Sequence, residues 1–119
     1  MTRWTLTDDG VAAVLAPLGV APGWDLAAEA TLPFGAPSAR MRRRLAHQVR
    51  QDLWRALRRV RGFVPVVRVA DAGGTAMLRA GGRVPGGRVA ERDRHRVADV
   101  ITNADNQRRW LAHAARAAV

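Results

Sequence analysis

The stretch S-A-R-M-R-R-R-L-A-H-Q-V-R-Q-D-L-W-R-A-L-R-R-V-R, from Ser38 to Arg61, decides the expected fold. Its apolar residues recur at spacings of three and four, which is the pattern of a helix that buries one face. Ser38 is suited to the N-cap and Gly62 to the stop. We therefore predict a helix over residues 39–61. Its buried face would consist of Met41, Leu45, Val49, Leu53, Ala56, Leu57 and Val60.

The other side of this helix is cationic. Arginine recurs there beside His47 and Trp54, and such a ridge can follow a phosphate backbone while the indole stacks on a base or sugar. The alternative is a solvated surface with Trp54 packed on a neighbouring element. Because Trp is more often buried than not, we expect packing for the indole alone, whereas for the arginines we expect contact with a polyanion. The candidate contact residues of this ridge are Arg40, Arg43, Arg44, Arg50, Trp54, Arg55, Arg58 and Arg59.

Charge is unevenly distributed along the chain. The 119 residues carry a net charge of +10, and all twenty basic residues are arginine, a usage that either guanidinium chemistry or a GC-rich genome can produce. Residues 1–37 have a net charge of −3, and residues 38–119 have a net charge of +13. A basic block of this density usually meets DNA, RNA or an acidic protein surface.

Length and composition indicate a single domain over residues 1–119, with an acidic portion at 1–37 and a basic portion at 38–119. There is no cysteine, which excludes disulfides and thiolate metal sites. No signal peptide or membrane span is visible, so we expect a cytoplasmic protein without a membrane partner.

Turn residues divide the N-terminal half into short elements. Thr7-Asp8-Asp9 is typical of a helix start, so we predict a short helix through Val11, Val14 and Leu15 that ends at Pro17 and Gly19. Residues 26–34 would form a strand or an extended entry to the long helix. Residues 35–38 would then break the chain direction before the long helix begins.

The C-terminal half is predicted to hold a hairpin and helices. Residues 63–70 are rich in β-branched side chains and predict a strand, with Pro65 at an edge or at the start. A turn at 71–74 would return the chain as a second strand over 75–80, followed by a glycine-rich basic connection over 81–88. Residues 90–119 would form one kinked helix or two short ones meeting at Thr102-Asn103. The predicted class is therefore a small α+β fold.

Side chains that could carry chemistry are sparse. Ser38 is the only serine, and the three histidines lack paired spacing, so a zinc site has weak support. The stretch T-N-A-D-N-Q-R-R-W, Thr102 to Trp110, is the densest polar segment. Thr102 with Asp105 three residues later could be a capping box, which would leave Arg108 and Arg109 free to face phosphate.

Three segments resemble RusA-type Holliday-junction resolvases: T-L-P-F-G-A-P-S-A-R, F-V-P-V-V-R-V and N-A-D-N-Q-R-R. The resemblance implies that Asp105 matches the second metal-binding aspartate of an acidic motif, Asn106 its asparagine and Arg109 its lysine. Asn103 stands where the first aspartate belongs, and an amide cannot supply the anionic ligand that Mg²⁺ favours. The resemblance covers about half of the chain and makes Asp105 the candidate catalytic residue.

Three functions remain open. The first is a nucleic-acid-binding protein of bacterial or phage origin, with DNA as the more expected ligand and no cofactor. The second is a nuclease, either RusA-like with Mg²⁺ and a role in DNA recombination, or a metal-free toxin-type RNase that uses Arg and His. The third is a phage accessory or inhibitor protein that docks on an acidic surface of a nucleoprotein complex. The opposite charges of the two portions would also allow copies to associate as a homodimer.

Overall fold

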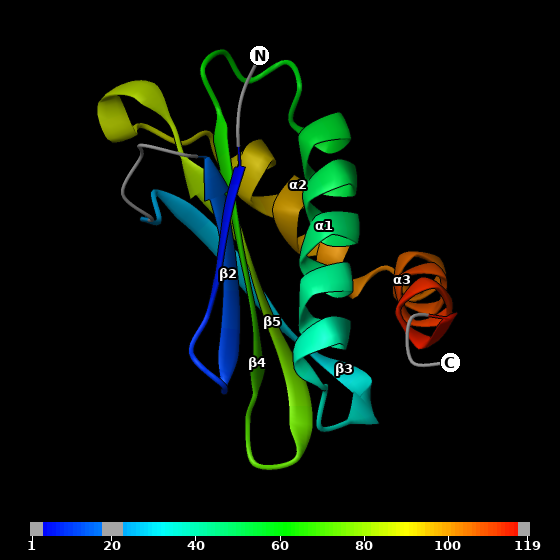
Figure 1. Ribbon diagram of the computed structural model, residues 1–119. Coiled ribbons are helices and arrows are strands. Elements are labelled where there is room, and N and C mark those ends of the chain that lie inside the picture. The colour runs from blue at the N-terminus through cyan, green and yellow to red at the C-terminus, as the bar shows by residue number, and fades with distance from the viewer. Residues whose placement is uncertain (1–3, 18–22, 117–119) are drawn as a thin grey trace.

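The structure is a computed structural model that describes residues 4–17 and 23–116. These residues form a five-stranded antiparallel sheet with helices packed on one face (Figure 1). The predicted α+β class is thus confirmed. The elements in chain order are β1 (Trp4–Asp8), β2 (Ala12–Pro17), β3 (Leu26–Gly35), α1 (Ala39–Ala56), β4 (Val64–Asp71), β5 (Thr75–Arg83), a short 3₁₀ turn (Pro85–Gly87), α2 (Glu91–Thr102) and α3 (Ala104–Arg116).

The strand order is β1-β2-β4-β5-β3, and each neighbouring pair runs antiparallel. The predicted hairpin is confirmed as β4 and β5, with its turn at Asp71–Gly74. Pro65 is the second residue of β4, outside the stretch that pairs with β2, so its missing N–H costs no bond there. The prediction that Pro65 marks a strand start therefore holds, although β4 is an inner strand.

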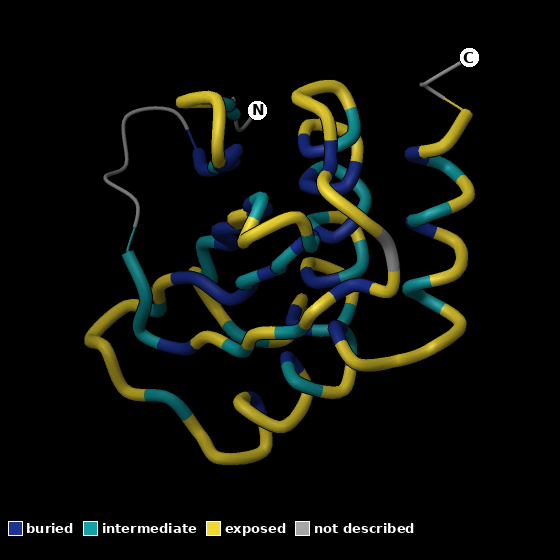
Figure 2. Tube along the Cα trace, turned by 90° about the horizontal axis from the view of Figure 1, so that it is seen from below, coloured by how far each residue is buried: buried dark blue, intermediate teal, exposed yellow. Residues whose placement is uncertain are grey.

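The core lies between the sheet and α1. Leu45, Val49 and Leu53 of α1 are fully buried, as the helical spacing predicts, and they pack with Val67 and Leu78 of the sheet. Ala76 and Ala80 of β5 belong to the same buried cluster. Figure 2 shows that buried positions concentrate between the layers, whereas the outer turns of the helices are exposed.

The long helix begins as predicted and ends earlier. The Ser38 hydroxyl accepts a hydrogen bond from the Met41 N–H at 3.2 Å, as an N-cap should. The helix ends at Ala56 rather than at Arg61, because the buried Leu57 leaves helical geometry. Single turns then carry the chain to Gly62, whose φ of +74° belongs to the left-handed region.

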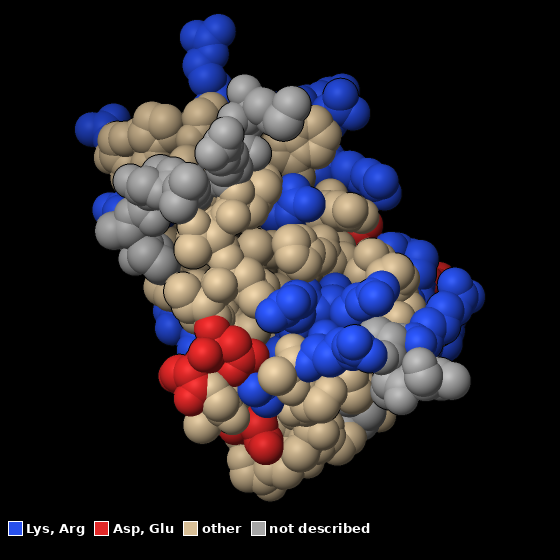
Figure 3. All heavy atoms as spheres, viewed as in Figure 1, with Lys and Arg blue, Asp and Glu red and all other residues tan. Residues whose placement is uncertain are grey.

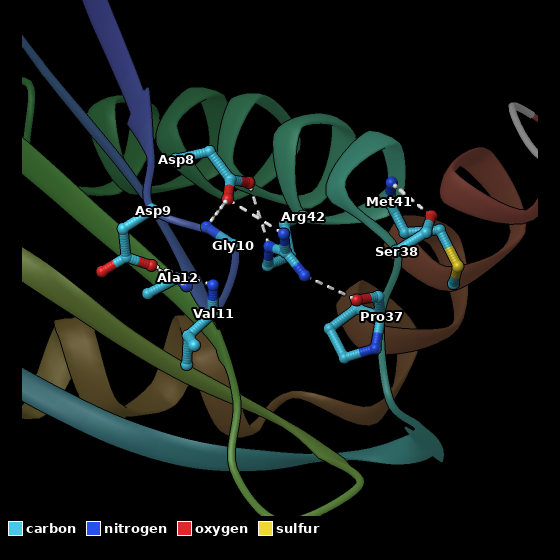
Figure 4. Close-up of polar contacts among 9 residues, drawn as sticks. All are labelled: Asp8, Asp9, Gly10, Val11, Ala12, Pro37, Ser38, Met41 and Arg42. Atoms are coloured by element: carbon cyan, nitrogen blue, oxygen red, sulfur yellow. Dashed lines mark hydrogen bonds and ion pairs between the residues drawn. The ribbon is translucent and has the colours of Figure 1, made fainter.

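The predicted helix at the N-terminus is wrong, because these residues form the hairpin of β1 and β2. Asp8 and Asp9 do cap free N–H groups, but those of a tight turn: Asp8 accepts from Gly10, and Asp9 accepts from Val11 and Ala12 (Figure 4). Turns and helix starts share this side-chain chemistry, so the pattern alone did not separate them. Gly19, the predicted helix end, lies outside the described residues.

The predicted glycine-rich connection is also partly wrong, because its first three residues extend β5. A Cβ on Gly81 would collide with the carbonyl of Leu26 in β3, and a Cβ on Gly82 would collide with the carbonyl of Val64 in β4. The two glycines therefore permit a close approach of three strands. The predicted strand over 26–34 is confirmed as β3.

A partly buried ion pair ties the hairpin of β1 and β2 to α1. The guanidinium of Arg42 donates from Nε and Nη2 to the two carboxylate oxygens of Asp8, at 3.0 and 2.9 Å, and from Nη1 to the carbonyl of Pro37 at 2.8 Å (Figure 4). The hydrogen bonds from Arg42 and from the Gly10 N–H hold the pKa of Asp8 below its usual range. Arg42 therefore belongs to the fold and not to the basic surface.

This pair predicts an acid-sensitive stability. Since the pKa of Asp8 is depressed in the folded state, its contribution is complete above the pKa of the unfolded chain and is lost as the pH falls through the folded value. Asp8→Asn should therefore unfold more easily than the parent protein at about pH 7, and the difference should shrink below about pH 4. Urea denaturation at both pH values measures this, with the exposed Asp99→Asn as the control. A difference that does not change with pH would contradict the assignment.

Candidate functional site

Most of the predicted ridge lies exposed on α1 and on the turn that follows it. Figure 3 shows basic side chains along the length of α1, whereas acidic side chains gather at the lower left of this view. The sequence of α1 holds six arginines and one acid, Asp52. The exposed residues of the predicted set on α1 and the following turn are Arg40, Arg43, Arg44, Trp54, Arg55, Arg58 and Arg59.

Trp54 differs from the expected packing, because 48% of its surface is exposed. It follows the buried Leu53 and lies a further 100° around the helix, which turns it away from the sheet. The guanidinium of Arg58 lies over its ring, 5.4 Å from the centroid. An exposed indole beside arginines is the arrangement that stacks on bases in single-stranded nucleic acids.

Arg50 is half-buried and already has a partner. Its guanidinium lies 4.5 Å from the centroid of the Trp4 ring, so it links α1 to the edge strand β1. Burial lowers the pKa of Arg50, and burial, Arg50 and Arg43 lower the pKa of His47. His47 is consequently neutral at neutral pH, and Arg50 is less available to a ligand than its position in the sequence indicates.

The stretch Thr102–Trp110 forms the corner between α2 and α3, so the two-helix alternative is the right one. The predicted capping box is wrong: the Thr102 hydroxyl donates to the Ala98 carbonyl at 2.7 Å, and the cap of α3 is Asn103, whose side-chain oxygen accepts from the Asn106 N–H at 2.9 Å. The amide that departs from the acidic motif thus has a structural role of its own.

The next two polar residues close the end of α2. The Asn106 side chain donates to the Val100 carbonyl at 3.0 Å, and the Gln107 side chain donates to the Ile101 carbonyl at 2.7 Å. These carbonyls belong to the last turn of α2, where the helix offers no further N–H groups. The corner is therefore held by side-chain amides at both helix ends.

The remaining residues of the stretch dock α3 on α1 through Asp52. One carboxylate oxygen of Asp52 accepts from the Arg109 guanidinium and from the indole N–H of Trp110, each at 2.6 Å. Trp110 is fully buried, and Figure 2 shows the buried positions of the helix that leads to the C-terminus on the side turned to the rest of the molecule. Arg109, a predicted phosphate contact, is thus occupied by an ion pair.

Asp105, the candidate catalytic residue, lies in the exposed first turn of α3 and forms an ion pair with Arg108. In the described ranges, no three His, Asp or Glu side chains come close enough together to hold a metal ion. Asp71 lies at the end of β4, and Asp93 and Asp99 lie in α2, on elements other than the one that carries Asp105. Asp105 and Arg108 therefore balance each other at the surface.

Comparison of the chain with models of protein families, with curated proteins and with solved structures found no match. None of the helices in the described residues is long and apolar enough to cross a membrane.

Sequence reasoning missed the roles of Asp52 and Arg42, two charged residues of α1 whose side chains bond to other elements. The sequence did offer an indication for Asp52, because it is the one acidic residue in a helix with six arginines. Arg42 carried a weaker one, since it falls at the edge of the buried face and not on the ridge. Their partners are 34 and 57 or 58 residues away in the chain, which no local pattern specifies.

The docking of α3 predicts contrasting effects for two acids. Asp52→Ala leaves the buried indole N–H of Trp110 without an acceptor and should destabilise the protein by about 1–3 kcal/mol. Asp105→Ala removes an exposed pair and should change the unfolding free energy by less than about 0.5 kcal/mol. Chemical denaturation measures both. Equal effects would contradict the role given to Asp52.

Proposed function

We propose that this protein binds nucleic acid through the arginine face of α1, with Trp54 as a stacking residue. The observation that carries the proposal is the half-exposed indole of Trp54 beneath the guanidinium of Arg58, on a helix whose exposed side holds arginines. Contacts of this kind go to phosphates and to the faces of bases, so binding would depend strongly on salt and weakly on sequence.

The electrostatics of α1 support the same proposal. The one acid of α1, Asp52, is turned towards α3, so it neutralises Arg109 more than it does the exposed arginines. Arg55 is 3.8 Å from Asp52 at a solvent-exposed position, a separation at which an ion pair contributes little. Arg43, Arg44 and Arg58 have no ion pair with another described residue, which leaves their charge available to phosphates.

The indole favours single-stranded or locally unpaired ligands over regular duplex, because a base must be unstacked before it can stack on Trp54. A resolvase-type metal centre has no place in the proposal, since Asn103 caps α3 and Asp105 pairs with Arg108. Binding to an acidic protein surface uses the same arginines but gives the indole no base to contact. Selective binding of such a protein, with no affinity for DNA or RNA, would therefore overturn the proposal.

Reversing two charges tests the arginine face. The double variant Arg44→Glu, Arg58→Glu should weaken binding to a single-stranded oligonucleotide at least tenfold. The slope of the logarithm of the binding constant against the logarithm of the salt concentration should fall by about one for each lost phosphate contact. Fluorescence anisotropy over a series of salt concentrations measures both. The matched control, Arg68→Glu with Arg88→Glu, changes the net charge equally at exposed positions away from α1. Equal losses in the two variants would mean that net charge alone drives binding.

Removing the indole tests the stacking contact. Trp54→Ala should weaken binding to single strands by about 1–3 kcal/mol and should affect duplex binding less. Trp54→Phe keeps an aromatic face and should retain most of the affinity. Competition between single-stranded and duplex oligonucleotides, DNA and RNA, gives the comparison, with and without Mg²⁺ so that cleavage is also scored. An unchanged preference in Trp54→Ala would remove Trp54 from the interface.

A further inference from the structure

A small cavity opens where the turns that follow α1 meet the start of α2. It has a volume of about 180 Å³, and its lining residues are Arg59, Val60, Arg92, Asp93 and Arg96. Three of the five are arginines, contributed by two elements. The cavity also lies at the positive end of the α2 dipole, because Arg92 and Asp93 belong to its first turn.

The three arginines of the cavity are not neutralised by ion pairs with other described residues. Their guanidinium groups keep N–H donors for a ligand, and a guanidinium pairs with phosphate through two parallel hydrogen bonds. Arg59 directly follows Arg58 of the α1 face. A strand bound along α1 would therefore meet this cavity at the end of the helix.

Asp93 gives the cavity a second chemical feature. Its side chain lines the cavity, the residue is only 9% exposed, and its carboxylate has no hydrogen bond or ion pair with the described residues. The carboxylate lines the cavity beside three arginines and can accept a hydrogen bond from a ligand. The cavity thus combines donors for an anion with an acceptor for a hydroxyl group, and a ligand that carries a phosphate and a hydroxyl group fits both.

We propose that this cavity binds a phosphate monoester together with a hydroxyl group of its sugar, as at the 5′-phosphorylated end of an RNA strand, whose sugar keeps its 2′-hydroxyl, or in a free nucleoside monophosphate. The arginines bind the phosphate, and Asp93 accepts a hydrogen bond from the hydroxyl. The volume is below the roughly 300 Å³ of pockets that enclose whole small molecules. The base therefore stays outside, and the cavity does not select among bases. The strand-end form of this proposal rests on the proposed function, whereas the free-nucleotide form does not.

Titration with adenosine monophosphate, adenosine and inorganic phosphate tests the chemistry, with chemical shifts or calorimetry as the readout. The monophosphate should bind saturably and at least tenfold more tightly than adenosine, which has the sugar without the phosphate. Arg92→Ala with Arg96→Ala should lose at least tenfold in affinity for the monophosphate. Arg94→Ala, an exposed arginine of the same helix that pairs with Glu91, should change it less than twofold. Equal binding of adenosine and its monophosphate would overturn the proposal.

Asp93→Asn separates the hydroxyl contact from a purely structural role. Removing the negative charge should tighten the binding of inorganic phosphate, because the repulsion between Asp93 and the phosphate is lost. It should also reduce the preference for adenosine monophosphate over inorganic phosphate. A structural role alone would leave that preference unchanged. Thermal unfolding of each variant confirms that the fold is retained.

RNA oligonucleotides with a 5′-phosphate and with a 5′-hydroxyl distinguish a strand end from a free nucleotide. A preference for the phosphorylated end that disappears in Arg92→Ala with Arg96→Ala assigns the cavity to strand ends. Monophosphate binding without such a preference assigns it to free nucleotides. The Arg44→Glu, Arg58→Glu variant should still bind the monophosphate. Loss of oligonucleotide binding in that variant, with no monophosphate binding in the parent, would leave the α1 proposal standing and would refute the cavity.

Discussion

The packing of α1 against the sheet is the constraint on which the rest of the structure depends. β2 and β4 are neighbours in the sheet, but β3 and α1 separate them in the chain. The chain must therefore pass through α1 before β4 can pair with β2. Leu45, Val49 and Leu53 supply the apolar contact. Polar contacts then fix the two sides of α1: Arg42 bonds to Asp8 of the hairpin, and Asp52 bonds to α3. Both bonds depend on where the apolar face places their side chains.

The arginines of this fold form two groups, those that hold elements together and those that lie exposed on α1, and the net charge does not distinguish them. Arg42 is buried in an ion pair, Arg50 lies on the Trp4 ring, and Arg109 bonds to Asp52, so these three hold elements together. The exposed arginines of α1 meet water in the free protein. The ion pairs of Arg42 and Arg109 each cancel one positive and one negative charge, so they leave the net charge of +10 unchanged. Figure 3 shows that part of this charge lies along α1.

Local patterns predicted the elements whose causes are local. The buried face of α1, the Ser38 cap and the β4–β5 hairpin follow from residue spacing and turn residues a few positions apart. The errors arose where one chemistry serves two structures, as with the aspartates that cap a turn instead of a helix. The role of Thr102–Trp110 could not be derived in the same way, because its partner Asp52 lies on another helix. Exposure of Trp54 was mispredicted because burial of tryptophan is an average and not a rule.

Trp54 shows where the requirements of the fold end. The fold buries Leu53 and Leu57 on either side of it in the chain, and these two side chains hold this end of α1 in the core. The Trp54 indole is 48% exposed and is not part of the buried core cluster. Residues that break the local pattern without stabilising the fold are expected at functional surfaces. Trp54 departs from the usual burial of tryptophan, and Arg58, whose guanidinium lies over its ring, has no ion pair with another described residue.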